Sequence, residues 1–509
     1  MKQNEIIDFF VNFLATPALL MGIFGMIGSI VQKKHSSEVF ISTIKTMIGY
    51  LVLAGGASLL VSSLTGFDLT VRELFGVSPV IPNNDGIGGL VQGSLGVIGT
   101  LSSIVMIMSM IGNIIIARLT NLKYIYLSGH VLFYISICVV VTSVMVGLDP
   151  NSDGWIIITI GSLIVSMYMV ISPAICQKFM ISITSTNDVA MGHTSGLNYC
   201  ISGYIGLAIS ILSKNKIKKC DDIKVSKKFA FIRNRSVLIT ATMTLIYAIV
   251  FFTGWGVLGK KWYVDNNIIE NSNSMIIIVL IKSLTFAAGM EVILFGVRTI
   301  LSELIPAFKG ISEKVVPGAK PALDCPIVFP YSQNAVFIGF FGSIFGGLLM
   351  FGLSILISGT TTITSIIIPG TISIFFTGAT AGVFGDTKGG RLGAIIAGFV
   401  DGFLVTLIPY LFILANLLPK EILAISATWG DSDFCIGLFI GFWKYINLGF
   451  DIKWAIFATS IFAWVLLITF GSIIQFKKNK KSKIEVEKNK QINKIDKKEV
   501  KDEKVENGK

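Results

Sequence analysis

Residues 155–178 read WIIITIGSLIVSMYMVISPAICQK, and no charged side chain occurs before Lys178. A run of about 20 apolar residues is long enough to cross a hydrocarbon core of roughly 30 Å as one helix. Runs of this kind recur from one end of the chain to the other, and they decide the fold. We predict an all-α polytopic membrane protein, because a transmembrane β-barrel would show shorter segments of alternating hydrophobicity.

The composition of the 509-residue chain supports this class. Hydrophobic residues make up 53% of the sequence and charged residues only 14%, against roughly 25% charged in ordinary soluble domains. The net charge of +12 does not indicate a nucleic-acid partner, because residues 477–509 hold 13 lysines and 7 acidic residues, a net +6. We predict a membrane translocator domain over residues 1–476, followed by a cytoplasmic, lysine-rich, disordered tail over residues 477–509.

The apolar runs predict about eleven transmembrane helices. Basic loops favour the cytoplasmic side of a membrane. If the N-terminus is outside and the C-terminus inside, five basic stretches all fall on the cytoplasmic side. They are QKKHSSE, ARLTNLKY, SKNKIKKCDDIKVSKKFAFIRNR, DTKGGR and the tail. The predicted spans lie near residues 8–31, 38–62, 92–117, 123–147, 155–178, 236–258, 274–305, 335–358, 364–384, 392–416 and 453–476.

Four stretches interrupt this pattern with polar residues, glycines or prolines, and we expect re-entrant hairpins there. They are residues 64–90, 180–213, 306–334 and 418–448. Irregular backbone at membrane depth is tolerated where it is buried in protein or lines a cavity. In transporters such interruptions point to the binding site. They recur in both halves of the chain, which would suit a pseudo-repeat.

Two of the three histidines share one setting. His130 lies in YLSGHVLF and His193 in AMGHTSGL, each directly after a glycine. One interpretation is a buried imidazole bonded to a backbone carbonyl. The other is a ligand contact, since an ionisable group inside the membrane is by default a candidate functional residue. A neutral imidazole both donates and accepts a hydrogen bond, which suits a polyol or sugar-like ligand.

Asp324 is the candidate carboxylate, in the proline-broken segment PALDCPIVFP. A buried carboxylate is costly unless it is paired or hydrogen-bonded. It either forms a charge pair with Lys320 or Arg298, or serves as an acceptor for ligand hydroxyls or as a proton site. Glu291 and Asp401 are interpreted as structural.

The sequence shows no Ser–His–Asp order and no metal-ligand pattern. The six cysteines are scattered without metal-ligand spacing, and HExxH does not occur. We therefore expect no cofactor, no metal site, and no enzymatic activity of this chain by itself.

Residues 296–340, GVRTILSELIPAFKGISEKVVPGAKPALDCPIVFPYSQNAVFIGF, carry a specific resemblance. With TIKTMIGYLVLAGGASLL, YLSGHVLF, MGHTSGL and IIPGTISIFFTGATAGVFGD, they follow the order and spacing of the ascorbate-type enzyme IIC of the bacterial phosphoenolpyruvate-dependent phosphotransferase system. The resemblance covers roughly residues 5–476.

The resemblance implies a multi-pass protein of the bacterial cell membrane. It implies a homodimer with eleven transmembrane helices and re-entrant hairpins in each chain. A core domain holds the ligand and moves like an elevator against a scaffold domain. The substrate implied by the resemblance is L-ascorbate, which a separate enzyme IIB would phosphorylate from its phosphocysteine, itself supplied through enzyme IIA. This chain lacks a phosphocysteine loop, so the phosphoryl donor would be another subunit.

The family's ligand-binding positions carry over where the motifs match. Its two GH-motif histidines fall on His130 and His193, and its LDC aspartate on Asp324. A polar contact after the second span falls near Asn84 and Asp85, where the alignment is loose.

Several positions depart from the family pattern. Tyr134 and Thr194 stand where the family has glutamine, and Ala54 and Ala57 where it has glutamine and serine. The galactitol-type enzyme IIC also carries a GHTS-like stretch, so another sugar, sugar acid or polyol is an open alternative. An ion-coupled secondary transporter with Asp324 as its proton site is the other.

Overall fold

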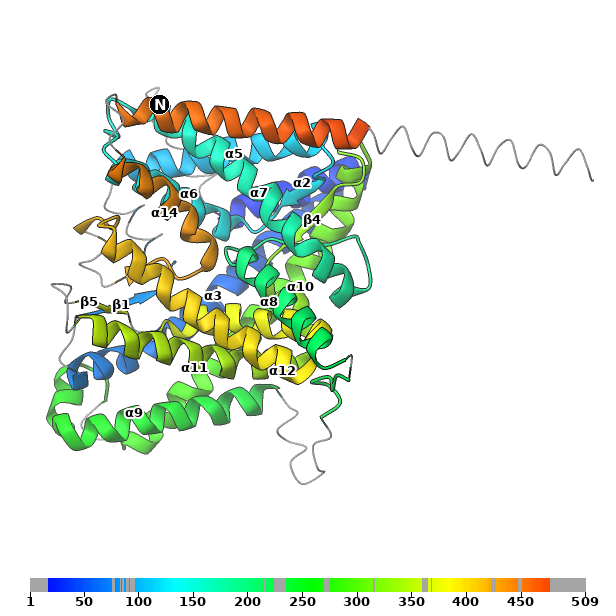
Figure 1. Ribbon diagram of the computed structural model, residues 1–509. Coiled ribbons are helices and arrows are strands. Elements are labelled where there is room, and N and C mark those ends of the chain that lie inside the picture. The colour runs from blue at the N-terminus through cyan, green and yellow to red at the C-terminus, as the bar shows by residue number, and fades with distance from the viewer. Residues whose placement is uncertain are drawn as a thin grey trace, which may run out of the picture.

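The computed structural model shows a bundle of long helices that lie side by side (Figure 1). It describes residues 17–75, 78–82, 84, 87, 91, 97–214, 216–223, 235–269, 274–314, 316–358, 365–367, 369–420, 422, 427–446 and 451–476. The N-terminal part of the first predicted span and the whole of the tail lie outside the described residues. So do some side chains within the helices.

Apolar helices account for most of the described chain. Six of them are long and apolar enough to cross a membrane, which confirms the helical membrane class, while the count of eleven stays a prediction. The principal helices are α2 (Pro17–Val31), α3 (Ser36–Phe75), α5 (Val97–Leu119), α6 (Gly129–Met145), α7 (Gly154–Thr184), α8 (Gly196–Leu212), α9 (Arg235–Asp265), α10 (Met275–Lys314), α11 (Gln333–Ser358), α12 (Thr371–Leu414), α14 (Cys435–Phe442) and the helix Ile452–Phe476.

Helix α12 is two helices joined at a break. Gly390 has φ 60° and ψ −152°, a backbone conformation that L side chains rarely adopt. The break falls between the predicted spans 364–384 and 392–416, so the sequence pattern separated these two spans at the right place.

Short strands are the feature that an all-α prediction missed. Within the described part of the chain there are two three-stranded sheets, and all of their pairings are parallel. The first has the order β5 (Ser365–Ile367), β1 (Ser78–Pro82), β6 (Ala427–Thr428), and the second the order β2 (Tyr124–Tyr126), β4 (Lys320–Leu323), β3 (Ala190–Met191).

Two predicted span boundaries were wrong for the same reason. The span predicted at 123–147 starts as a helix only at Gly129, because β2 takes its first residues. The span predicted at 364–384 starts at Thr371, because β5 precedes it. Both apolar stretches are long enough to span, but their first residues pair with strands from distant parts of the chain.

The described elements follow one order twice. A 40-residue helix opens each half, α3 in the first and α10 in the second. In the first half this helix is followed by β1, α5, β2, α6, α7, β3 and α8. In the second half it is followed by β4, α11, β5, the two segments of α12, β6 and α14. Strand β1 of the first half is the central strand of one sheet, between β5 and β6 of the second half. Strand β4 of the second half is the central strand of the other sheet, between β2 and β3 of the first half. The two halves are thereby interlocked.

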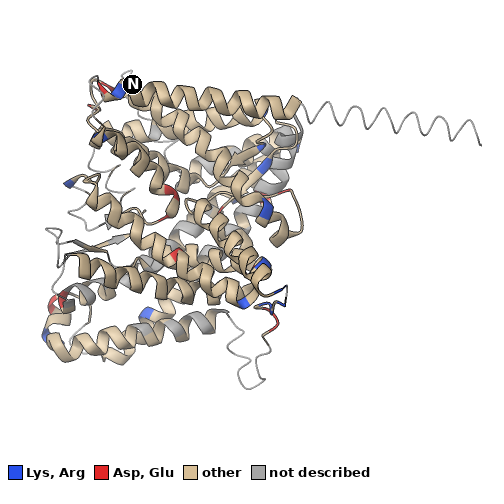
Figure 2. Cartoon of the chain, in the orientation of Figure 1, with Lys and Arg blue, Asp and Glu red and all other residues tan. Residues whose placement is uncertain are grey.

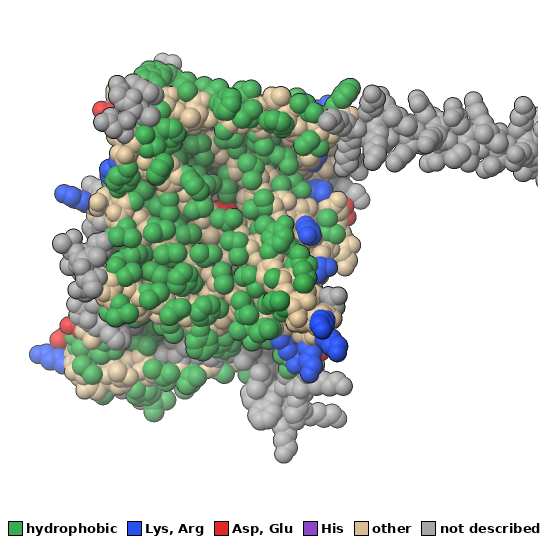
Figure 3. Space-filling model, in the orientation of Figure 1, with side chains coloured by type: hydrophobic (Ala, Val, Ile, Leu, Met, Phe, Trp, Pro, Cys, Tyr) green, Lys and Arg blue, Asp and Glu red, His purple; other side chains and the backbone are tan. Residues whose placement is uncertain are grey.

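The outer surface suits a lipid environment. Figure 3 shows a broad hydrophobic face, with Lys and Arg mainly along its right-hand edge, and Figure 2 shows few charged residues within the helical body. Phe462, Phe470 and Phe476 of the helix Ile452–Phe476 are all more than 60% exposed. Contiguous exposed apolar surface of this kind marks contact with lipid or with another protein.

Candidate functional site

The second sheet places two predicted site residues side by side. Gly192 continues β3 by donating from its backbone N–H to Leu323 O at 2.7 Å, so His193 and Asp324 follow neighbouring strand ends. A Cβ atom on Gly192 would lie 2.7 Å from Ala322 O, which explains why a glycine precedes this histidine. His193 Nε2 lies 3.9 Å from Asp324 Oδ1.

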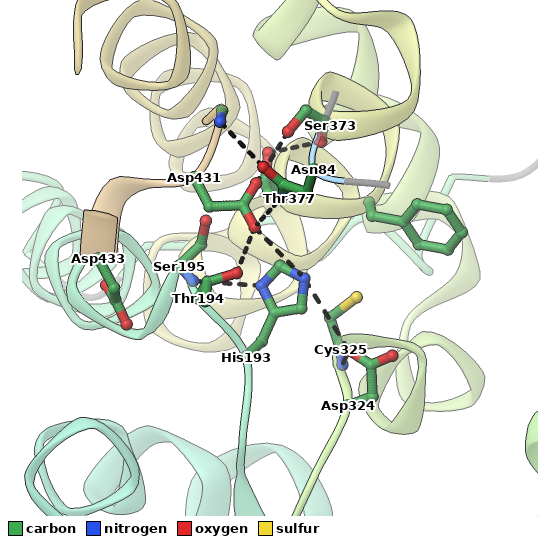
Figure 4. A network of polar contacts seen from close by, with 12 residues as sticks. Asn84, His193, Thr194, Ser195, Asp324, Cys325, Ser373, Thr377, Asp431 and Asp433 are labelled. Carbon is green, nitrogen blue, oxygen red and sulfur yellow. Dashed lines mark hydrogen bonds and ion pairs between the residues drawn. The ribbon is translucent and has the colours of Figure 1, made fainter. Parts of the chain in front are cut away.

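The first sheet brings a second set of polar residues to the same place. Asn84 follows β1, Asp431 follows β6, and Ser373 lies in the first turn of the helix after β5. Asp431 accepts hydrogen bonds from Asn84 Nδ2 at 3.1 Å and from Ser373 Oγ at 2.8 Å. It also accepts one from the hydroxyl of Thr194, which joins the two sets (Figure 4).

His193 stands between the two carboxylates. Its Nε2 is 4.0 Å from Asp431 Oδ2 and 3.9 Å from Asp324 Oδ1. The exposed fraction of the side chain is 10% for His193, 4% for Asp431 and 22% for Asp324. These three side chains are thus largely buried, and Asp324 is the most accessible of them.

The surrounding hydrogen bonds fix the tautomer of His193. Its Nδ1 accepts from the backbone N–H of Ser195 at 3.2 Å and lies 3.0 Å from the hydroxyl of Tyr199. A backbone N–H can only donate, so Nδ1 must present its lone pair. The proton of the neutral ring therefore resides on Nε2, which faces the two carboxylates.

Asp433 locks the two halves of the site together. Its carboxylate accepts from the backbone N–H groups of Gly196 and Leu197 at 2.9 and 2.8 Å, at the start of α8. Tyr168 and Ser172 of α7 donate to the same carboxylate at 3.0 and 3.1 Å. A carboxylate at a helix N-terminus satisfies free N–H groups and complements the helix dipole. This contact anchors the segment carrying Asp431 against the segment carrying His193.

A metal ion is one conceivable occupant, since the ligand atoms of His193, Asp324 and Cys325 lie within 4.8 Å of one another. Metal coordination by Nε2 would move the ring proton to Nδ1. A proton on Nδ1 would face the backbone N–H of Ser195, and the hydrogen bond between these two atoms would be lost because both would be donors. The hydrogen-bonding pattern thus fits a hydroxyl-bearing ligand better than a metal.

The structure brings together four of the seven residues assigned to the site from sequence: His193, Thr194, Asp324 and Asn84. Tyr134 lies in α6 as a partly buried residue, with its ring centroid 6.5 Å from that of Phe133. His130 is the second residue of α6, but its side chain is outside the described residues, as is Asp85.

Asp431 and Ser373 were missed by the sequence analysis. The internal repeat carries the signal that could have found Asp431. Gly430 and Asp431 follow β6 as Gly192 and His193 follow β3, so GDSD matches GHTS in position. Ser373 has no comparable signal, because serines are common in these helices.

The carboxylates interpreted as structural have partners. Asp401 accepts hydrogen bonds from Ser343 Oγ at 2.9 Å, from Thr377 Oγ1 at 2.7 Å and from Asn198. Glu291 accepts from Ser236 Oγ at 2.6 Å.

A buried polar site, built where helices break inside an apolar bundle, defines a membrane transport protein. The family model described as the PTS system sugar-specific permease component (EIIC-GAT) matches residues 12–433, and the chain belongs to this family of multi-pass membrane proteins. It is also 26% identical over 440 residues to the "Ascorbate-specific PTS system EIIC component" of Mycoplasma pneumoniae, across 77% of this chain and 64% of that relative.

Proposed function

We propose that this chain is the membrane permease, enzyme IIC, of a phosphotransferase system. It binds L-ascorbate or a related sugar or polyol and presents it in the cytoplasm to a separate enzyme IIB for phosphorylation. The observation that carries this proposal is the convergence of His193, Asp324 and Asp431 between two sheets inside an apolar bundle. The family membership and the ascorbate-specific relative support the sugar class.

An elevator movement is supported by the way the helices pack. Helices α2, α3, α9 and α10 pack against one another, whereas α5 to α8, α11, α12 and α14 pack around the site. We assign the first group to a scaffold, which would also form the homodimer interface, and the second to a moving core. A rigid core can carry an enclosed ligand past a fixed scaffold without exposing the ligand to lipid.

The phosphoryl group would come from another subunit. Cys220, in the loop between α8 and α9, has a fully buried side chain, and its backbone N–H donates to Asp386 Oδ1 at 2.9 Å. Burial raises the pKa of the Cys220 thiol. A buried neutral thiol is a poor nucleophile, so it is unsuited to carry phosphate.

Uptake into membrane vesicles tests the proposal. We expect accumulation of a phosphorylated sugar only when phosphorylated enzyme IIB is supplied on the cytoplasmic side. His193→Ala should abolish binding while the protein still folds. Accumulation of unmodified substrate driven by a proton gradient alone would instead establish the ion-coupled alternative.

A further inference from the structure

We propose that Asp401 is a proton-binding site: its side chain retains a proton and, as a neutral acid, joins α8, α11 and the two segments of α12 through hydrogen bonds. Asp401 is separate from the polar site between the two sheets. The inference therefore does not depend on which ligand that site holds.

The first step concerns burial. Asp401 lies on the second segment of α12, and its side chain is fully buried. Its hydrogen-bond partners are Ser343 of α11, Thr377 of the first segment of α12 and Asn198 of α8, which are fully buried as well. All three partners are neutral. Within the described part of the chain, Asp401 thus has no hydrogen-bonded cation to balance a negative charge.

The second step concerns the wider surroundings. Helices α8 and α11 contain neither Lys nor Arg. The cation of α12 nearest to Asp401 along the chain is Arg391, ten positions away, which corresponds to about 15 Å of helix. The ionisable groups that act on Asp401 are the carboxyl group of Asp431 and the phenol of Tyr199. A second negative charge near Asp431 would be repelled, and an uncompensated buried carboxylate is costly.

The third step concerns the count of protons. Thr377 Oγ1 lies 2.7 Å from Asp401 Oδ2 and 2.8 Å from the backbone oxygen of Ser373. A threonine hydroxyl has one proton, so it can make a full hydrogen bond to only one of these two acceptors.

A protonated Asp401 supplies the missing proton. Its O–H donates to Thr377 Oγ1, and the hydroxyl of Thr377 then donates to Ser373 O. The atoms keep their positions, and only the direction of the bond between Asp401 and Thr377 differs from that in an ionised carboxylate. Ser343 and Asn198 still donate to Asp401, so each of the four contacts has a proton of its own.

A proton fits this place better than a metal ion. Oxygen atoms that ligate a cation turn their lone pairs toward it, whereas the hydroxyls of Ser343 and Thr377 are at hydrogen-bonding distance from Asp401. The helices also meet closely here. A Cβ atom on Gly402 would lie 1.8 Å from Ser343 O, and one on Gly378 would lie 2.3 Å from Ser343 Cβ.

Infrared spectroscopy of the purified full-length protein in lipid tests the inference directly. At neutral pH, the difference spectrum between wild type and Asp401→Asn should contain the C=O stretching band of a protonated carboxyl group, present only in the wild type. Asp386→Asn is the matched control, because Asp386 is a buried carboxylate on the same helix that accepts a backbone N–H, and it should leave this band in place. A difference confined to the bands of ionised carboxylate overturns the inference.

Thermal unfolding in detergent supplies a second arm. Asparagine should replace the neutral acid, because its amide oxygen accepts from Asn198 and its two N–H groups can donate to Thr377 Oγ1 and Ser343 Oγ. Asp401→Ala removes all of these contacts. It should lower the thermal midpoint at least about twice as far as Asp401→Asn does. Equal falls in the two variants contradict the role of the neutral acid.

The same measurement separates a proton site from a cation site. We expect equal thermal midpoints in sodium chloride and choline chloride at the same ionic strength. Stabilisation by sodium that Asp401→Asn abolishes would identify a bound cation at Asp401 and overturn the inference.

Discussion

At the residue scale, two aspartates two positions apart have different roles. Asp431 accepts hydrogen bonds from side chains and faces His193 Nε2. Asp433 accepts from two backbone N–H groups at the start of α8 and from two side chains of α7. The first is a candidate ligand contact, and the second fixes the local backbone, so substitutions of the two should differ in kind.

Asp433→Asn should destabilise the protein by about 1–3 kcal/mol, because it leaves buried donors without a charged acceptor. The measurement is the thermal midpoint in detergent, with Asp188→Asn, an exposed carboxylate, as the control. An unchanged midpoint would show that the Asp433 contacts contribute little to folding.

Cys220 should resist alkylation in the folded protein. Its side chain is fully buried, and burial raises the pKa of its thiol, so little thiolate exists near neutral pH. In a variant that keeps only this cysteine, iodoacetamide should react at least about ten-fold more slowly than with denatured protein. Cys220→Ser should retain phosphorylation-dependent uptake. Loss of uptake in that variant would contradict a purely structural role.

At the element scale, the short strands answer a physical requirement. A chain that breaks its helices at membrane depth must satisfy its free backbone groups within the protein. In each sheet, three short strands at such breaks pair in parallel and so satisfy these backbone groups. The chain therefore leaves all three strands at the same edge of the sheet. The polar residues gather there because all three strands run in the same direction.

Two glycines of α11 offer a matched test of helix packing. A Cβ atom on Gly346 would lie 1.9 Å from Phe399 O in α12, whereas one on Gly352 would have no heavy atom within 4 Å. Gly346→Ala should lower the thermal midpoint, because backbone must move apart. Gly352→Ala should leave it unchanged or raise it, since alanine is the better helix former by about 0.5–1 kcal/mol. Equal effects of the two substitutions would contradict the close contact of α11 with α12.

At the scale of the whole molecule, cysteine labelling tests the orientation of the chain in the membrane. The positive-inside pattern predicts that the loop near Asn151 faces outward and the loop near Lys216 faces the cytoplasm. Both residues are exposed. In a background without the six native cysteines, Asn151→Cys should react with a membrane-impermeant maleimide on intact cells. Lys216→Cys should react only after permeabilisation, and the reverse pattern would invert the proposed orientation.

Much of the architecture was predictable because it depends on local composition. Apolar runs of membrane length predict helices wherever they occur, and Gly390 lies between two runs that were predicted separately. His193 and Asp324 stood out because ionisable side chains are rare in such sequence. The strand positions were not predictable, because each strand pairs with partners far away in the chain.

The sequence by itself determined that this protein is a helical membrane protein of the sugar-specific permease family, and that His193 and Asp324 are its unusual side chains. Only the tertiary structure decided that Asp431 joins them, because its contact with Thr194 spans 237 positions of the chain. The tertiary structure also placed Asp324 and Asp431 near Nε2 of His193, the nitrogen that carries the proton because Nδ1 accepts a hydrogen bond from the N–H of Ser195. The length of an apolar run is a property of consecutive residues, whereas the chemistry of the site depends on which strand ends the fold places next to one another.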